Sequence, residues 1–169
     1  MRIEEDLKLD FKDVLIRPKR STLTSRSEVD ISREFVFLHS KQPYHGIPII
    51  AANMDPVGTF EMAQALAKHQ LSAALHKHYA EDDLVRFFRT HTAEVPTFYS
   101  MGITRADYEK FRRVRDQTGE AILYVCVDVA NGYTKAFVDF IHQLRLAEPQ
   151  ITLMAGNVTI NMLIFATGL

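Results

Sequence analysis

The most constraining feature of the sequence is a pattern that repeats from residue 47 onward. Short apolar runs begin near Ile47, Leu71, Thr97, Ala121 and Ile151, at spacings of 24, 26, 24 and 30 residues. A run as continuously apolar as residues 47–51 is typical of a strand buried on both faces of a parallel sheet. Each run is followed by polar residues and an amphipathic stretch, and strands that alternate with single helices indicate parallel pairing. The pattern therefore predicts an α/β fold.

Two α/β architectures fit this alternation. Repeated units of this length, with polar residues after each strand, favour a TIM (β/α)8 barrel, whereas the periodicity alone leaves an open doubly wound sheet as an alternative. No Gly-rich dinucleotide fingerprint follows any strand, which weakens the open sheet. The chain has 169 residues, whereas a complete barrel takes roughly 250. We therefore expect a partial barrel holding about the first five β/α units.

The sequence divides into three segments. Residues 1–46 form a polar N-terminal extension, in which the apolar pieces 14–16 and 35–38 are candidates for a short hairpin. Residues 47–158 are the expected partial barrel, and residues 159–169 are an apolar tail. Within the barrel, Thr104 followed by Asp107 predicts a capping box at a helix start. The three carboxylates of residues 81–83 are also suited to the N-terminal end of a helix.

Composition limits the class of protein. The chain is 47% hydrophobic and 24% charged, as in globular proteins, and 20 Lys and Arg residues nearly balance 21 Asp and Glu residues. This balance predicts neither a nucleic-acid nor a membrane partner, and the basic cluster Arg17-Pro18-Lys19-Arg20 is interpreted as a solvated charge run. A single cysteine, together with an acidic first segment that lacks the apolar core of a signal peptide, favours the cytoplasm.

Polar residues follow the predicted strands. Asn53 and Asp55 come after the first strand, and His76, Lys77 and His78 follow the second. Because the carboxyl ends of parallel strands share one edge, these side chains are expected to face one site. From the residue types alone, Asn53 and Asp55 are turn and capping residues or ligands of a ribose or base.

The second of these clusters has two interpretations. His76 and His78 lie on one face of an extended chain, but zinc takes at least three protein ligands and no third is spaced nearby. Lys77 is either a surface lysine or a phosphate ligand.

Cys126 lies inside an apolar run and is expected to be a buried, unreactive thiol rather than a nucleophile. No Gly-x-Ser-x-Gly elbow is present.

Several long blocks of the sequence resemble one enzyme family. They are DLKLDFKDVLIRPKRS, IPIIAANMD, VGTFEMA, HKHY, DVANGY and MAGNV, in the family's order and spacing. Over residues 1–158 the chain resembles the IMP dehydrogenase/GMP reductase family, and most closely its GMP reductase branch. The resemblance implies a TIM barrel and a homotetramer that carries out NADPH-dependent, irreversible reductive deamination of GMP to IMP and ammonia.

The resemblance also implies a set of binding residues. The pair Ser25 and Arg26 would reach the dinucleotide of a neighbouring subunit, and Lys77 and Asp128 would sit close enough to form an ion pair. The implied NADPH ligands are Ser25, Arg26, Lys77, Asp128, Val129 and Ala130, and the implied substrate ligands are Asn53, Met54, Asp55, Gly156 and Asn157.

The chain departs from the family pattern in three places. The family's nucleophilic cysteine, which attacks C2 of the purine before hydride transfer, lies in a Gly-Pro-Gly-Ser-Val-Cys-Thr-Thr loop that this sequence lacks. The family's potassium site would lie in the same missing region. Pro56 stands where the family usually has Thr, which removes a backbone donor and a hydroxyl. Residues 159–169, TINMLIFATGL, do not follow the family's acidic helix, so we expect a truncated or alternative C-terminus.

These departures predict a chain of reductase lineage that is inactive alone. Two alternatives stay open. One is an IMP dehydrogenase-like oxidoreductase, although that branch usually has a Ser-Pro version of the motif that is Ala52-Asn53-Met54-Asp55 here. The other is a non-catalytic fragment that associates with full-length subunits.

Overall fold

The computed structural model describes residues 7, 9–91, 94–119 and 121–158. The chain divides into two compact units, Met1–Asp30 and Ile31–Leu169. The first unit contains two 3₁₀ helices, η1 (Phe11–Asp13) and η2 (Arg26–Glu28). The predicted apolar tail, residues 159–169, lies outside the described residues.

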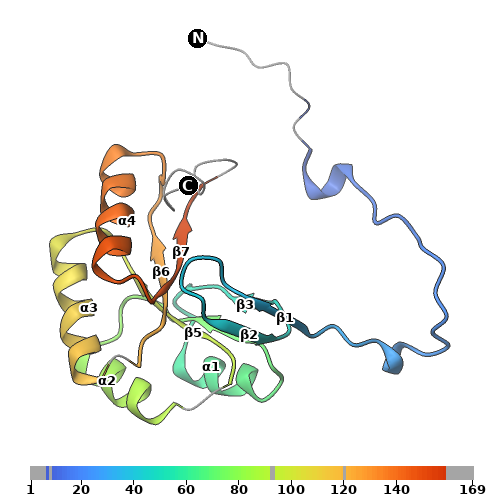
Figure 1. The fold of residues 1–169 in the computed structure, drawn as a ribbon, viewed down its shortest axis with the longest axis horizontal. Helices are drawn as coiled ribbons and strands as arrows, with labels where there is room; N and C mark the ends of the chain where they lie inside the picture. The colour runs from blue at the N-terminus through green and yellow to red at the C-terminus, as the bar shows by residue number, and fades with distance from the viewer. Residues whose placement is uncertain (1–6, 8, 92–93, 120, 159–169) are drawn as a thin grey trace. The chain divides into compact units, whose positions relative to one another are not determined.

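The second unit contains a hairpin and a parallel sheet (Figure 1). Strand β1 (Arg33–Val36) pairs antiparallel with β2 (Pro43–Gly46). The sheet has the order β3-β4-β5-β6-β7, and every neighbouring pair is parallel. Its strands are Ile50–Ala51, Ser72–Ala74, Thr97–Met101, Tyr124–Asp128 and Thr152–Gly156. Five consecutive parallel strands in a curled half-barrel confirm the predicted fold class.

Four helices connect these strands, and their ends follow local sequence signals. They are α1 (Phe60–Ala67), α2 (Glu81–Thr90), α3 (Arg105–Gln117) and α4 (Lys135–Ala147). The capping box before α3 is confirmed, because the Thr104 hydroxyl accepts from Asp107 N while the Asp107 carboxylate accepts from Thr104 N, each at 3.1 Å. Helix α2 begins with the three predicted carboxylates. Within the described residues, no helix is long and apolar enough to cross a lipid bilayer.

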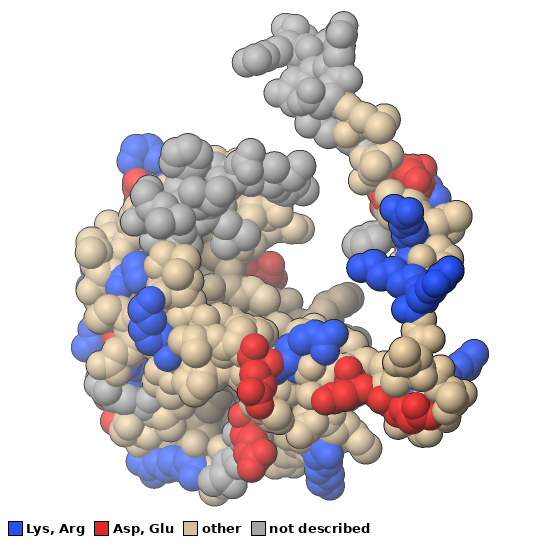
Figure 2. Space-filling view, turned by 45° about the vertical axis from the view of Figure 1, so that its right-hand side comes forward, with Lys and Arg blue, Asp and Glu red and all other residues tan. Residues whose placement is uncertain are grey.

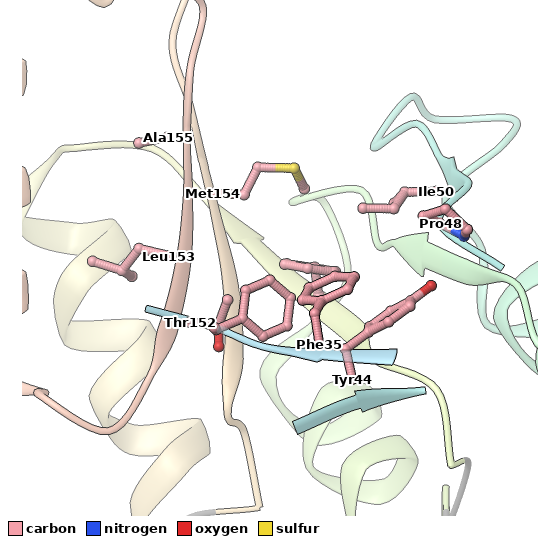
Figure 3. Close-up of a pocket in the computed structure, with 10 residues that line it drawn as sticks. Phe35, Tyr44, Pro48, Ile50, Thr152, Leu153, Met154 and Ala155 are labelled. Carbon is pink, nitrogen blue, oxygen red and sulfur yellow. The ribbon is translucent and has the colours of Figure 1, made fainter. Parts of the chain in front are cut away.

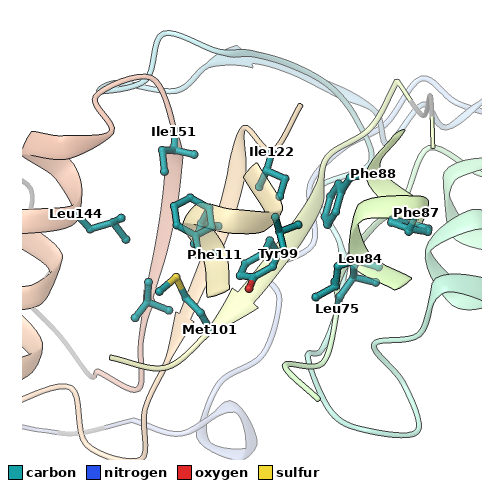
Figure 4. Close-up of a cluster of buried hydrophobic side chains, with 14 of the residues drawn as sticks. Leu75, Leu84, Phe87, Phe88, Tyr99, Met101, Phe111, Ile122, Leu144 and Ile151 are labelled. Carbon is teal, nitrogen blue, oxygen red and sulfur yellow. The ribbon is translucent and has the colours of Figure 1, made fainter. Parts of the chain in front are cut away.

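Alternate side chains of each strand enter two different clusters, as the pleat requires. Tyr99 and Met101 of β5 point into the main core with Phe111 of α3 and Leu144 of α4 (Figure 4). The opposite, concave face holds a smaller cluster built on Ala74, Phe98 and Cys126. The helices thus cover the outer face of the sheet and leave the inner face to the hairpin.

The hairpin differs from the prediction. Residues 35–38 do contribute to it, but residues 14–16 are exposed and lie outside any strand, and β2 is the actual partner. Tyr44 of β2 is buried and stacks on Phe35, with ring centroids 4.7 Å apart. The turn between the strands is anchored to β7, because the hydroxyls of Ser40 and Thr152 lie 2.7 Å apart. Aromatic packing against the sheet therefore selects the pairing.

The prediction that residues 47–51 are buried on both sides was wrong. Strand β3 is only two residues long, and Ile49 and Ile50 are 60% and 40% exposed. The cause is that β3 lies at one edge of the sheet and pairs with β4 alone within the described residues. Ile50 instead borders an apolar cavity of about 320 Å³ between hairpin and sheet, near Phe35, Tyr44 and Met154 (Figure 3).

Charged side chains of both signs lie on the face that Figure 2 shows. On the face shown in Figure 2, the Lys and Arg side chains of residues 31–158 are interspersed with Asp and Glu side chains. Neither sign covers a continuous area of that face over the described residues. This distribution agrees with the balanced composition of the sequence.

Candidate functional site

The predicted polar residues gather at the carboxyl ends of the parallel strands. Asn53 follows β3, and its Nδ2 donates a hydrogen bond of 3.0 Å to Oδ2 of Asp128, the last residue of β6. Strands β4 and β5 lie between these two strands in the sheet. The bond therefore spans the concave end of the half-barrel instead of joining neighbouring strands.

The segment after β3 is fixed tightly against the end of β4. The carbonyl of Met54 accepts from the amides of Val57 and Gly58 at 2.9 and 2.7 Å. The carbonyl oxygen of Gly58 accepts a hydrogen bond from His76 N at 2.8 Å. A Cβ added at Gly58 would lie 2.3 Å from the carbonyl oxygen of Ala74. Only glycine permits this approach. Pro56 fits the turn, because the amides that close it belong to other residues.

His76 connects this segment to an aromatic stack. Its Nε2 lies 3.7 Å from Oδ1 of Asp55, and its ring stacks on Tyr79 with centroids 4.0 Å apart. Because Nδ1 accepts from the backbone amide of His78 at 3.3 Å, the neutral ring carries its proton on Nε2. The ring therefore presents an N–H group to the Asp55 carboxylate. No group of three metal-ligating side chains occurs within the described residues.

The expected ion pair between Lys77 and Asp128 is not formed. The Asp128 carboxylate bonds to Asn53 instead, and the exposed ammonium of Lys77 has no ion-pair partner in the described part of the chain. An exposed pair gains little over two hydrated charges, so its absence costs little. The backbone around Lys77 is nevertheless held, because Nζ of Lys110 donates to the carbonyls of Lys77 and Tyr79 at 3.4 and 2.5 Å.

The segments after β6 and β7 are joined by backbone hydrogen bonds. Val129 N donates to Gly156 O at 2.9 Å, and Asn157 N donates to Val129 O at 3.0 Å. Gly132 N also donates a hydrogen bond to Asn157 O at 3.0 Å. A Cβ added at Gly132 would lie 2.5 Å from Cγ1 of Val158. The two predicted binding segments are therefore a single backbone unit.

Most of the predicted site residues thus share one end of the sheet. They are Asn53, Met54, Asp55, Lys77, Asp128, Val129, Ala130, Gly156 and Asn157. Ser25 and Arg26 belong to the first unit, where the Ser25 hydroxyl caps η2 by accepting from Ser27 N at 3.2 Å. Their role toward a cofactor stays a prediction.

Sequence reasoning missed three supporting residues: Gly58, Tyr79 and Lys110. Gly58 had a usable signal, since a glycine between a strand end and a helix often marks a close backbone approach. Lys110 had none, because it is one of several charged residues on an amphipathic helix and its acceptors lie 31 and 33 residues away.

Cys126 is buried, as predicted, and burial raises the pKa of its thiol to about 11. The raised pKa leaves the thiol neutral at pH 8, where an unfolded cysteine is about a quarter thiolate. We expect iodoacetamide to label Cys126 in the native chain at least about a hundredfold more slowly than in the urea-unfolded chain. Mass spectrometry of timed samples measures both rates, and equal rates would contradict the buried assignment.

Comparison with known proteins places this arrangement in a family. Residues 8–164 match the IMP dehydrogenase / GMP reductase domain. Proteins named GMP reductase from Citrobacter koseri and Salmonella typhi are each 54% identical over 160 residues, which is 94% of this chain and 46% of theirs. The chain thus spans about half the length of these relatives.

A solved structure shows the same fold. The crystal structure of inosine 5′-monophosphate dehydrogenase from Legionella pneumophila superposes with a TM-score of 0.67 at 27% identity. The superposition covers 88% of this chain and 43% of the dehydrogenase. Sequence, fold and the polar strand ends together show that the chain belongs to the IMP dehydrogenase/GMP reductase family.

Proposed function

We propose that this chain forms the cofactor-facing part of a GMP reductase, an enzyme for NADPH-dependent, irreversible reductive deamination of GMP to IMP and ammonia. The observation that best supports this proposal is that backbone pairing connects Asp128 and Val129, at the end of β6, to Gly156 and Asn157, at the end of β7. The 54% identity to proteins named GMP reductase favours the reductase over the dehydrogenase, because the identity to the Legionella pneumophila dehydrogenase is 27%.

The residues at this end have the chemistry to hold NADPH. The exposed Lys77 ammonium, without an ion-pair partner in the described residues, suits a phosphate of the dinucleotide. The Asp128 carboxylate has acceptor capacity beyond its bond to Asn53, which suits an N–H or O–H donor such as a carboxamide or ribose hydroxyl. Val129 and Ala130 would line the same cofactor, and Ser25 and Arg26 would reach that of a neighbouring subunit. NADPH, when bound, supplies the hydride.

The purine nucleotide would lie beside the cofactor. Asp55, faced by the Nε2–H of His76, is an acceptor for ribose hydroxyls, and the exposed Met54 side chain offers an apolar contact for a base. Asn53, Gly156 and Asn157 complete this side of the proposed nucleotide site. Because Gly156 is paired with Asp128 in the sheet, the two proposed ligands would meet at the β6 and β7 ends.

We further propose that the 169-residue polypeptide by itself does not deaminate GMP. Its one cysteine is buried with a raised pKa, so no thiolate is available to attack the purine. Phosphate sites of such barrels form after strands seven and eight, and the sheet described has five strands. The potassium site would likewise be supplied by the remainder of the longer relatives. We assign the complete enzyme to the cytoplasm as a homotetramer.

Titration of the purified chain with NADPH, followed by cofactor fluorescence, tests the proposal. We expect saturable binding that Lys77→Ala weakens about tenfold, because a charge-assisted bond to a phosphate contributes about 1.5–3 kcal/mol. Lys68→Ala, which removes another exposed lysine at the end of α1, should bind as the unchanged chain does. Absence of NADPH binding would refute the cofactor role, and NADPH oxidation on addition of GMP would refute the claim of inactivity.

A further inference from the structure

The hydrogen bond between Asn53 and Asp128 gives Asn53 a second role, in addition to the substrate contact proposed above. Its amide donates at 3.0 Å to a carboxylate 75 residues later in the sequence. A carboxylate can only accept hydrogen bonds, so this charge-assisted bond fixes which way its two oxygens face. Within the described residues, no other side chain forms a hydrogen bond or an ion pair with the Asp128 carboxylate.

Asp128 needs such a partner because of its location. It is exposed at the end of β6, whereas the preceding residue, Val127, is fully buried in the main core. The backbone of Asp128 is held by its pairing with Gly156, but that pairing does not restrain the side chain. The Asn53 backbone is restrained from a different direction, because the segment that follows it is fixed to β4 through Gly58 and His76.

We propose that Asn53 is a positioning residue that orients the Asp128 carboxylate toward a nicotinamide dinucleotide. The bond to Asn53 engages Oδ2 and leaves Oδ1 to accept from the ligand. Orienting a side chain before the ligand arrives reduces the entropy lost on binding. The inference rests on the proposed cofactor role of Asp128.

A double-mutant cycle on NADPH affinity tests the inference. The variants are Asn53→Ala, Asp128→Ala and the combination of both, in the full chain. We expect Asn53→Ala to weaken NADPH binding about fivefold to tenfold, and Asp128→Ala to weaken it at least as much. In the Asp128→Ala background, the Asn53 substitution should change the affinity less than about twofold, because the carboxylate that it orients is gone. Gln64→Ala, which removes an exposed amide on α1, is the control and should bind as the unchanged chain does.

Two further measurements separate positioning from a general structural role. Thermal unfolding followed by circular dichroism should give similar midpoints for Asn53→Ala and the control, because the contact is exposed. The side-chain amide resonances of Asn53 should move in the Asp128→Ala variant, as expected for a direct contact.

The outcomes distinguish this inference from the proposed function. If the unchanged chain binds NADPH but Asn53→Ala binds equally well, or if the two effects add, the positioning role is overturned while the cofactor role stands. If the unchanged chain does not bind NADPH, both are overturned.

Discussion

Replacement of Glu148 by Ala should lower the free energy of unfolding by about 3–5 kcal/mol, because it removes the carboxylate that faces the buried Arg115 guanidinium. The Arg115 guanidinium of α3 donates through Nη1 to Oε2 of Glu148, the residue that follows the last residue of α4. The two side chains are only 8% and 9% exposed, so water cannot replace the lost carboxylate. Urea unfolding followed by circular dichroism measures the change.

Two control variants make this expectation specific. Replacing both partners by apolar residues of similar volume, Arg115→Met with Glu148→Leu, should restore most of the stability, because no charge is then left buried. Asp139→Ala breaks the exposed pair with Lys135 on α4 and should cost less than about 1 kcal/mol. A loss for Glu148→Ala no greater than that for Asp139→Ala would contradict the assignment of a buried pair.

The order and type of the elements could be predicted because their signals are local. Strands alternate with helices from residue 47 onward, and the capping box before α3 consists of residues only three apart. The burial of residues 47–51 could not be predicted from local sequence signals. An apolar composition shows that a strand can be buried, whereas its actual burial depends on which strands lie beside it. Strand β3 has a described neighbour, β4, on one side only.

The candidate site could be predicted as a set of residues but not as a set of contacts. Polar residues after successive parallel strands must share one end of a sheet, which located Asn53, Asp55, Lys77 and Asp128 correctly. Which of them bond depends on side-chain reach across the curved sheet, so the predicted Lys77–Asp128 pair is replaced by the Asn53–Asp128 bond. The Arg115–Glu148 pair, between residues 33 apart, likewise had no local signal.

Two leucines of α4 provide a matched test of how this helix packs on the sheet. Leu144 is 2% exposed and lies in the main core, whereas Leu146, two residues later, is 82% exposed. Leu144→Ala should lower the free energy of unfolding by about 2–5 kcal/mol, because it removes buried methyl groups and leaves a cavity. Leu146→Ala makes the same chemical change at a solvated position and should cost less than about 0.5 kcal/mol. Urea unfolding of the two variants measures both effects, and similar losses would show that α4 does not turn its Leu144 face to the sheet.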